Sequence, residues 1–444
     1  MTTITSILAP IVGSGQVYPF EELAAPLQHQ IRRALNPNES LPVGVFPNTQ
    51  ADLAAVIACA HTHQWRLLIC GQGSKLHWGS LTSNIDLVVS TQHLNRLVDH
   101  AAGDLTVTVE AGMPFATLQQ HLAPAHQFLA LDPAYADQAT IGGVIATRDA
   151  GALRHRYGGV RDLVLGVTFV RADGQIAKAG GRVVKNVAGY DLMKLLSGSY
   201  GTLAVLTQAT LRLYPLPATS ATRLLTGNPD HIAAATQALF CSTLTPTAID
   251  LLTPQLFMPW VSAGGLGLTV RFQSFAESVA AQCDRLQSLA HAHQLTLTPI
   301  TATDDAGFWD SLQHQLWSTA SPPDPAVICK IGILPAVAAP TLTTLAQTCQ
   351  TQGFTLQGRI HASSGLGTLR LTGDAFPSVE LLRELRSHCH QAQGFLTVLQ
   401  APPDLKSRLD IWGYTGNALT IMQQIKTQFD PGNLLNPGRF VQGI

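Results

Sequence analysis

The first segment whose residue types and spacing could do chemistry is Gly71-Gln72-Gly73-Ser74-Lys75. It directly follows a short apolar run, residues 66–70, which predicts a buried strand. Glycines at such a place let main-chain N–H groups turn toward one point and let a ligand approach without interference from a Cβ atom. The segment therefore suits a diphosphate, with a hydroxyl from Ser74 and a charge from Lys75, although a tight strand-to-loop turn would look the same.

Two common nucleotide-binding patterns are absent from the sequence. A dinucleotide fingerprint G-x-G-x-x-G would need glycine where Leu76 stands, followed at once by a helix. No G-x-x-x-x-G-K-[ST] pattern occurs in the chain, which excludes a P-loop nucleotide hydrolase.

Two further segments are dense in small residues. The second begins at residues 131–133, contains the string ATIGGVIAT at 139–147, and continues through Gly151 to HRYGGVRD at 155–162. Such a surface lets the backbone lie against a flat or extended ligand, and a glycine-rich crossover between strands is the equal alternative. The third runs through residues 180–192 and on to GSYGTL at 198–203.

Hydrophobic periodicity predicts the elements that must position these segments. Residues 51–64 form a helix capped by Asn48 or Thr49, and residues 104–112 alternate as a strand with its apolar side chains on one face. The pair Asp173–Gly174 predicts a hairpin turn between two strands. After residue 217, helical and strand patterns alternate without glycine landmarks, which indicates a second α+β domain.

Composition limits the class of protein. The chain has 444 residues, a formal net charge of −1, 46% hydrophobic residues and 12% charged residues. This balance excludes intrinsic disorder and argues against an extended nucleic-acid footprint. No run reaches the roughly 18–20 apolar residues of a membrane helix, and the first residues lack the basic region of a signal peptide, so a soluble, cytoplasmic protein is expected.

The seven cysteines are scattered, and no two form a C-x-x-C pair. The sequence therefore offers no support for a zinc ribbon or a cysteine-bound iron–sulfur cluster, and we expect free thiols and no metal site.

Taken together, the glycine-rich segments resemble the FAD-binding domain of the vanillyl-alcohol-oxidase/p-cresol-methylhydroxylase (PCMH) class. The blocks VRDLVLG, KNVAGYDLMKLLSGSYGTLAVLT and NPGRF are similar, in order and wording, to the FAD-binding (E) subunits of bacterial glycolate oxidase. The resemblance is dense over residues 40–217 and good in the C-terminal tail. It implies an α+β fold: an N-terminal extension at 1–38, a PCMH-type FAD-binding domain of two subdomains at 39–217, a smaller α+β cap domain at 218–428, and a tail at 429–444 that returns to the FAD domain.

The resemblance also implies which residues hold FAD. The main-chain amides at 71–75 and at 140–143 would converge on the two ends of the dinucleotide, the tail would bring Asn436 to the isoalloxazine, and His77 would not be linked covalently to the flavin. The implied cofactor-binding set is Gly71, Gln72, Gly73, Ser74, Lys75, Pro133, Thr140, Ile141, Gly142, Gly143, Thr147, Gly151, Tyr157, Gly158, Asp162, Gly201, Leu206 and Asn436.

The catalytic residues are less well marked. Related D-2-hydroxy-acid dehydrogenases carry an H-x-G-D-G-N-x-H stretch, and the matching place here is residues 361–370. The acidic residue and the second histidine are replaced by Leu366 and Arg370, which argues against a divalent metal site. Arg370 could bind a carboxylate, with Arg359 or Lys330 as helpers, or could simply face solvent on a strand; His361 is the candidate base.

The implied function is that of an FAD-binding subunit of a glycolate (2-hydroxy acid) oxidase or dehydrogenase complex, which takes part in electron transfer. Its partners would be a catalytic flavin subunit and an iron–sulfur subunit, and any membrane contact would be made through them. A stand-alone FAD-dependent 2-hydroxy-acid dehydrogenase and a non-catalytic, FAD-stabilised assembly subunit are the alternatives.

Overall fold

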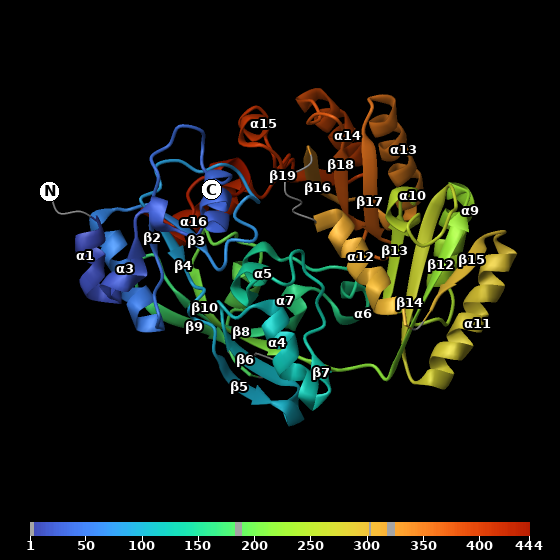
Figure 1. The fold of residues 1–444 in the computed structure, drawn as a ribbon, viewed down its shortest axis with the longest axis horizontal. Helices are drawn as coiled ribbons and strands as arrows, with labels where there is room; N and C mark the ends of the chain where they lie inside the picture. Colours follow the sequence, from blue (N-terminus) through green and yellow to red (C-terminus); the bar gives the residue numbers. More distant parts are fainter. Residues whose placement is uncertain (1–3, 183–188, 302, 318–324) are drawn as a thin grey trace. The chain divides into compact units, whose positions relative to one another are not determined.

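The computed structural model describes residues 4–182, 189–301, 303–317 and 325–444 (Figure 1). These residues form two compact units. Unit 1 contains the described residues of 1–150, 158–216 and 402–444, and unit 2 contains those of 151–157 and 217–401. The division differs from the expected domains in two places. Residues 151–157 group with unit 2, and residues 402–428 group with unit 1, where Lys406 donates hydrogen bonds to the carbonyls of His77 and Gly79.

Unit 1 contains a four-stranded sheet in the order β1-β2-β4-β3, with β2, β4 and β3 parallel. Its strands are β1 (Val17–Tyr18), β2 (Val43–Val45), β3 (Leu67–Cys70) and β4 (Leu87–Ser90). The helices α1 (Ile4–Val12) and α3 (Gln50–His63) pack against it through a shared apolar core, and α2 (Ala25–Arg32) belongs to a second core. The predicted helix and cap are confirmed: Thr49 accepts from the Asp52 amide, and the Asp52 side chain accepts in return from the Thr49 amide.

A five-stranded antiparallel sheet in the order β5-β6-β10-β8-β9 completes the core of unit 1. The predicted hairpin joins β8 to β9, with Gly174 at a φ of 84°. All five residues of β6 are buried, so both faces of this strand are covered. The strands are β5 (Leu97–Ala101), β6 (Thr106–Glu110), β8 (Val164–Val170), β9 (Ile176–Gly180) and β10 (Val205–Arg212). Two further short strands, β7 (Gln127–Phe128) and β11 (Tyr214–Pro215), pair with each other.

Short helices connect the strands of unit 1. The seven-residue helix α5 (Ile141–Thr147) begins at Thr140, whose hydroxyl accepts from the Gly143 amide, and its buried face joins the core of the five-stranded sheet. The other α-helices are α4 (Phe115–Leu122), α7 (Val160–Leu163), α8 (Leu192–Leu196), α15 (Pro403–Ser407) and α16 (Leu419–Phe429).

Unit 2 is built on one antiparallel sheet of eight strands in the order β15-β12-β14-β13-β17-β18-β16-β19. Side chains alternate between its faces: Gly358 faces Leu342 of α13, and the next residue, Arg359, faces Trp309 of α12. The strands are β12 (Thr219–Gly227), β13 (Ala248–Leu252), β14 (Leu266–Ser274), β15 (Thr296–Ile300), β16 (Ala326–Gly332), β17 (Thr355–His361), β18 (Leu366–Thr372) and β19 (Phe395–Gln400). The helices are α6 (Arg154–Tyr157), α9 (Pro229–Phe240), α10 (Pro254–Phe257), α11 (Ala276–Ala292), α12 (Asp305–Trp317), α13 (Ala338–Thr351) and α14 (Val379–Gln391).

The predicted α+β class is confirmed, because helices pack on sheets whose strand pairs are largely antiparallel. Within the described residues, no helix combines the length and the apolar character that crossing a bilayer requires.

Candidate functional site

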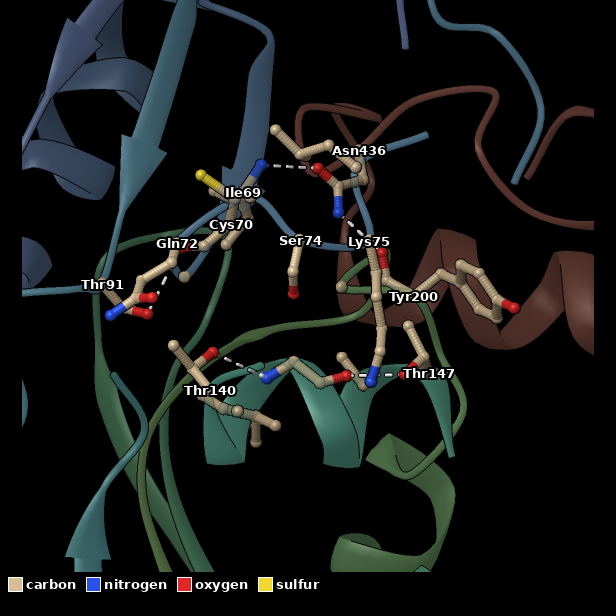
Figure 2. Close-up of a pocket in the computed structure, with 18 of the residues that line it drawn as sticks. Ile69, Cys70, Gln72, Ser74, Lys75, Thr91, Thr140, Thr147, Tyr200 and Asn436 are labelled. Atoms are coloured by element: carbon tan, nitrogen blue, oxygen red, sulfur yellow. Dashed lines mark hydrogen bonds between the residues drawn. The ribbon is translucent and has the colours of Figure 1, made fainter. Parts of the chain in front are cut away.

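A cavity lies in unit 1 between the loop that follows β3 and the helix α5 (Figure 2). Segments far apart in the sequence meet at it: the β3 loop, α5, the segment around Tyr200, and the C-terminal tail. Its lining residues are Ile69, Cys70, Gly71, Gln72, Gly73, Ser74, Lys75, Leu76, Thr91, Thr140, Gly142, Gly143, Ala146, Thr147, Ser199, Tyr200, Gly201, Ala204, Leu206, Asn436 and Arg439.

The loop and the start of α5 lie in close contact at Gly71. A Cβ atom on Gly71 would overlap the side chain of Thr140, so only glycine lets the two segments approach this closely. In Figure 2 the hydroxyl of Ser74 points across the cavity toward α5. The structure thus brings together the two segments that the sequence singled out for the ends of a dinucleotide.

The main-chain amides of these two segments differ in their availability. The N–H groups of Ile141 and Gly142 donate to the carbonyls of Met113 and Ala111 at 2.9 and 2.7 Å, and that of Gly143 donates to the Thr140 hydroxyl. By contrast, within the part of the chain that the structure describes, the N–H groups of residues 71–75 donate to no protein acceptor. The β3 loop alone therefore presents a group of unpaired donors, which is the property of an anion-binding nest.

The charge of Lys75 is already engaged inside the protein. Its Nζ lies 2.7 Å from Asp149 Oδ2, and the two side chains are 5% and 12% exposed. The same carboxylate oxygen accepts from the Ala134 amide at 2.8 Å. The lysine expected to face a diphosphate is therefore neutralised by a protein carboxylate.

Asn436 joins the tail to the β3 loop. Its side-chain oxygen accepts from the Ile69 amide at 2.7 Å, and its side-chain nitrogen donates to the Tyr200 carbonyl at 2.6 Å (Figure 2). Gly201 has a φ of 71°, and a Cβ there would come within 2.6 Å of the Asn436 amide nitrogen. Asn436 therefore lines the cavity as expected, and both polar groups of its side chain also hold the surrounding backbone in place.

The predicted set omits several lining residues, and three of them, Cys70, Tyr200 and Arg439, carry ionisable groups. Burial raises the pKa of the Cys70 thiol to about 12 and raises that of the Tyr200 phenol, whose ring packs against Trp412 at a centroid distance of 5.0 Å. Arg439 is 4% exposed, and burial lowers the pKa of its guanidinium to about 10. The sequence signals were the position of Arg439 inside the NPGRF block and that of Tyr200 inside the string GSYGTL.

Twelve of the eighteen predicted cofactor residues line the cavity and six do not. Ile141 is buried in the core, while Gly158 lies against Asp162, whose carboxylate accepts from the Gly159 amide at 2.8 Å. Pro133 is not among the lining residues, and Gly151 and Tyr157 group with unit 2. Part of the third glycine-rich segment, residues 183–188, lies outside the described residues.

His77, the residue considered for a covalent flavin link, also lies outside the cavity lining. Its ring nitrogens contact Gln30 Oε1 at 2.9 Å and the Tyr135 hydroxyl at 3.3 Å, and the residue is 1% exposed. Both nitrogens are thus engaged by protein partners.

Unit 2 contains a buried ionic cluster on strands β13 and β17. Asp250, which is fully buried, receives the Arg359 guanidinium on one oxygen at 2.7 and 2.8 Å and His361 Nδ1 on the other at 2.6 Å. Arg370 on β18 is 6% exposed and donates to the Leu316 carbonyl at 3.4 Å, so it is not a solvent-facing strand residue. Among the residues that the structure describes, no three His, Cys, Asp or Glu side chains form a group that could hold a metal.

Comparison with known proteins identifies an FAD-binding domain in the chain. Residues 42–180 match the model of the FAD binding domain family. The chain is 23% identical to the glycolate oxidase subunit GlcD of Bacillus subtilis over 90% of this chain and 89% of that protein. It is 38% identical to the glycolate oxidase subunit GlcE of Escherichia coli over 35% of this chain and 44% of that protein. It is 35% identical to a D-2-hydroxyglutarate dehydrogenase of Xanthomonas citri over 45% of this chain and 43% of that protein. Both matches thus cover less than half of the relative.

Solved structures show the same fold. A 4-ethylphenol oxidase from Gulosibacter chungangensis matches with a TM-score of 0.75 at 15% identity, over 98% of this chain and 96% of its own. A p-cresol methylhydroxylase matches with a TM-score of 0.73 at 13% identity, over 98% and 95%. The unpaired amides and the buried Arg439 at the cavity suit an anionic dinucleotide such as FAD. Residues 42–180 therefore match an FAD-binding domain, in a chain that has the PCMH-type fold and is similar to glycolate oxidase subunits.

Proposed function

We propose that the cavity of unit 1 binds FAD and that the chain serves the oxidation of a small 2-hydroxy acid. The observation that carries the cofactor assignment is the group of unpaired N–H donors at residues 71–75, which lines a cavity inside the matched FAD-binding domain. These amides would hold the diphosphate, and the Ser74 hydroxyl would add a donor. FAD, when bound, supplies an acceptor for a hydride from carbon.

The buried cluster of unit 2 would supply proton chemistry. The Asp250 carboxylate can only accept, so the Nδ1 of His361 carries the hydrogen and Nε2 carries a lone pair. A histidine fixed in this tautomer can accept the hydroxyl proton of a 2-hydroxy acid. Arg370, on β18, is proposed to bind the substrate carboxylate.

For the protein's wider role, we propose a subunit of a glycolate (2-hydroxy acid) oxidase complex that works with a catalytic flavin subunit and an iron–sulfur subunit. The similarity to GlcD over nine-tenths of this chain and the higher identity to GlcE over 35% of it support this role. The hydrogen bond between His361 and Asp250 favours the second candidate, a stand-alone FAD-dependent dehydrogenase, because it orients a base on this chain.

The flavin is expected to be bound without a covalent link. Both ring nitrogens of His77 are occupied by protein partners, and the residue does not line the cavity. Purified protein should be yellow, and acid precipitation should release the colour into the supernatant. Colour that stays with the pellet would contradict the noncovalent assignment.

Anaerobic mixing with glycolate and with D-lactate separates the two proposed roles. If the chain is a subunit, the isolated holoprotein should keep its flavin colour and should bleach only when both partner subunits are added. Rapid bleaching of the isolated chain would instead establish a stand-alone enzyme, and this bleaching should slow strongly in a His361→Ala variant. A protein that never binds flavin would refute both roles.

A further inference from the structure

We propose that Arg439, and not the loop residue Lys75, supplies the positive charge that faces the diphosphate of FAD. This inference rests on the proposed FAD site and assigns its charged residue. It starts from the position of Arg439 on the wall of the cavity, in the same lining as the unpaired amides of residues 71–75.

Arg439 is a buried cation without a counterion in the described part of the chain. Its Nη2 donates to the carbonyls of Leu76 and Trp78 at 2.7 and 2.5 Å, and Nη1 lies 3.5 Å from the Ser80 carbonyl. Its buried Nε has no hydrogen-bond partner there. A buried charge is costly unless an opposite charge compensates for it, and neutral carbonyls compensate only in part.

A second buried cation reinforces this charge. Lys406 is 5% exposed, and its Nζ donates to the carbonyls of His77 and Gly79, the two residues interleaved with those that Arg439 holds. The repulsion from Arg439 is strong enough to contribute to a lowered pKa of Lys406, after the larger effect of burial. Two cations thus converge on residues 76–80, directly after the anion-binding loop, and an anion in the cavity would relieve their repulsion.

Lys75 is in the opposite situation. It forms an ion pair with Asp149 at 2.7 Å, so the pair as a whole contributes little net charge to the cavity. FAD carries a doubly negative diphosphate, and its affinity should therefore depend on the charge at position 439 more than on the Lys75–Asp149 pair.

The test compares two variants of similar size that differ in charge. Arg439→Lys keeps a cation, whereas Arg439→Gln keeps an N–H donor for the loop carbonyls and removes the charge. Apoprotein of each is titrated with FAD, and binding is followed by quenching of flavin fluorescence. Arg439→Gln should bind FAD about tenfold more weakly or worse, Arg439→Lys should stay within about threefold of wild type, and riboflavin, which lacks the diphosphate, should bind all three proteins alike.

The matched control removes the competing ion pair as a unit. A Lys75→Met, Asp149→Asn double variant should bind FAD within about threefold of wild type. Equal losses in Arg439→Lys and Arg439→Gln would overturn the proposal, as would an equal loss of riboflavin affinity or a tenfold loss in the double variant. Failure of wild-type apoprotein to bind FAD would instead refute the proposed FAD site itself, and circular dichroism of each apoprotein identifies any variant that does not fold.

Discussion

Replacement of Asp250 by asparagine is expected to lower the free energy of unfolding of unit 2 by about 3–5 kcal/mol. The carboxylate is fully buried and is shared by Arg359 and His361 at 2.6–2.8 Å. An amide of the same shape would remove the negative charge that lies 2.7 Å from the guanidinium, which is itself 3% exposed. The loss arises from the weaker compensation of that buried positive charge more than from the attraction between the pair.

The effect of this substitution should depend on pH in a defined direction. Burial alone would raise the pKa of Asp250, but the charge of Arg359 and the interactions and hydrogen bonds with Arg359 and His361 outweigh it, and the pKa is lowered. A carboxyl whose pKa is lower in the folded state contributes stability above its unfolded pKa, which is about 3.9, and this contribution is lost as the pH falls through the folded pKa. The difference between wild type and Asp250→Asn should therefore stay constant near neutrality and shrink only in acid.

Denaturant unfolding at several pH values measures this difference. Adding Arg359→Met to Asp250→Asn should recover much of the lost stability, because the buried cation is then removed together with the carboxylate. As a control, Glu380→Gln breaks an exposed ion pair to Arg383 in the same unit and should leave the free energy of unfolding nearly unchanged. An Asp250→Asn protein as stable as wild type would show that the cluster is not a buried ion pair in solution.

Asn436→Ala is expected to destabilise unit 1 by about 2–4 kcal/mol and to abolish the retention of FAD during purification. The substitution removes two hydrogen bonds, to the Ile69 amide and to the Tyr200 carbonyl, and leaves both main-chain groups without partners. Ile69 lies just before the unpaired amides of residues 71–75, and Tyr200 lines the same cavity. Loss of these two hydrogen bonds should therefore loosen two walls of the cofactor site together.

Thermal unfolding of the apoprotein and the flavin content of the purified protein report the two effects separately. Gln424→Ala, on the exposed side of α16 in the same C-terminal segment, should change neither quantity. An Asn436→Ala protein that keeps wild-type flavin content would show that the Asn436 hydrogen bonds are not needed for FAD retention, even if its unfolding temperature fell.

Local patterns predicted much of this protein because their causes are local. The Thr49 cap is formed by residues three apart, and the β8–β9 hairpin by the Asp173–Gly174 turn. The glycine-rich loop was located because glycines after a buried strand let backbone amides turn toward one point. The resemblance added the cofactor and the return of the C-terminal tail to the first domain, where Asn436 contacts β3.

Hydrogen bonds and ion pairs between residues distant in the chain determined the remaining features of the site. The sequence shows that Lys75 follows a glycine loop, but only the fold brings Asp149 to its Nζ and so removes its charge from the cavity. In the same way, the amides of Ile141 and Gly142 are consumed by carbonyls about thirty residues away, and Asp250 meets His361 across two adjacent strands. From the sequence alone, one can tell which residues carry donors and charges and where the chain turns. Which of those groups remain unpaired depends on neighbours distant in the chain, because hydrogen bonds and ion pairs form through space, and the tertiary structure alone assigns those partners.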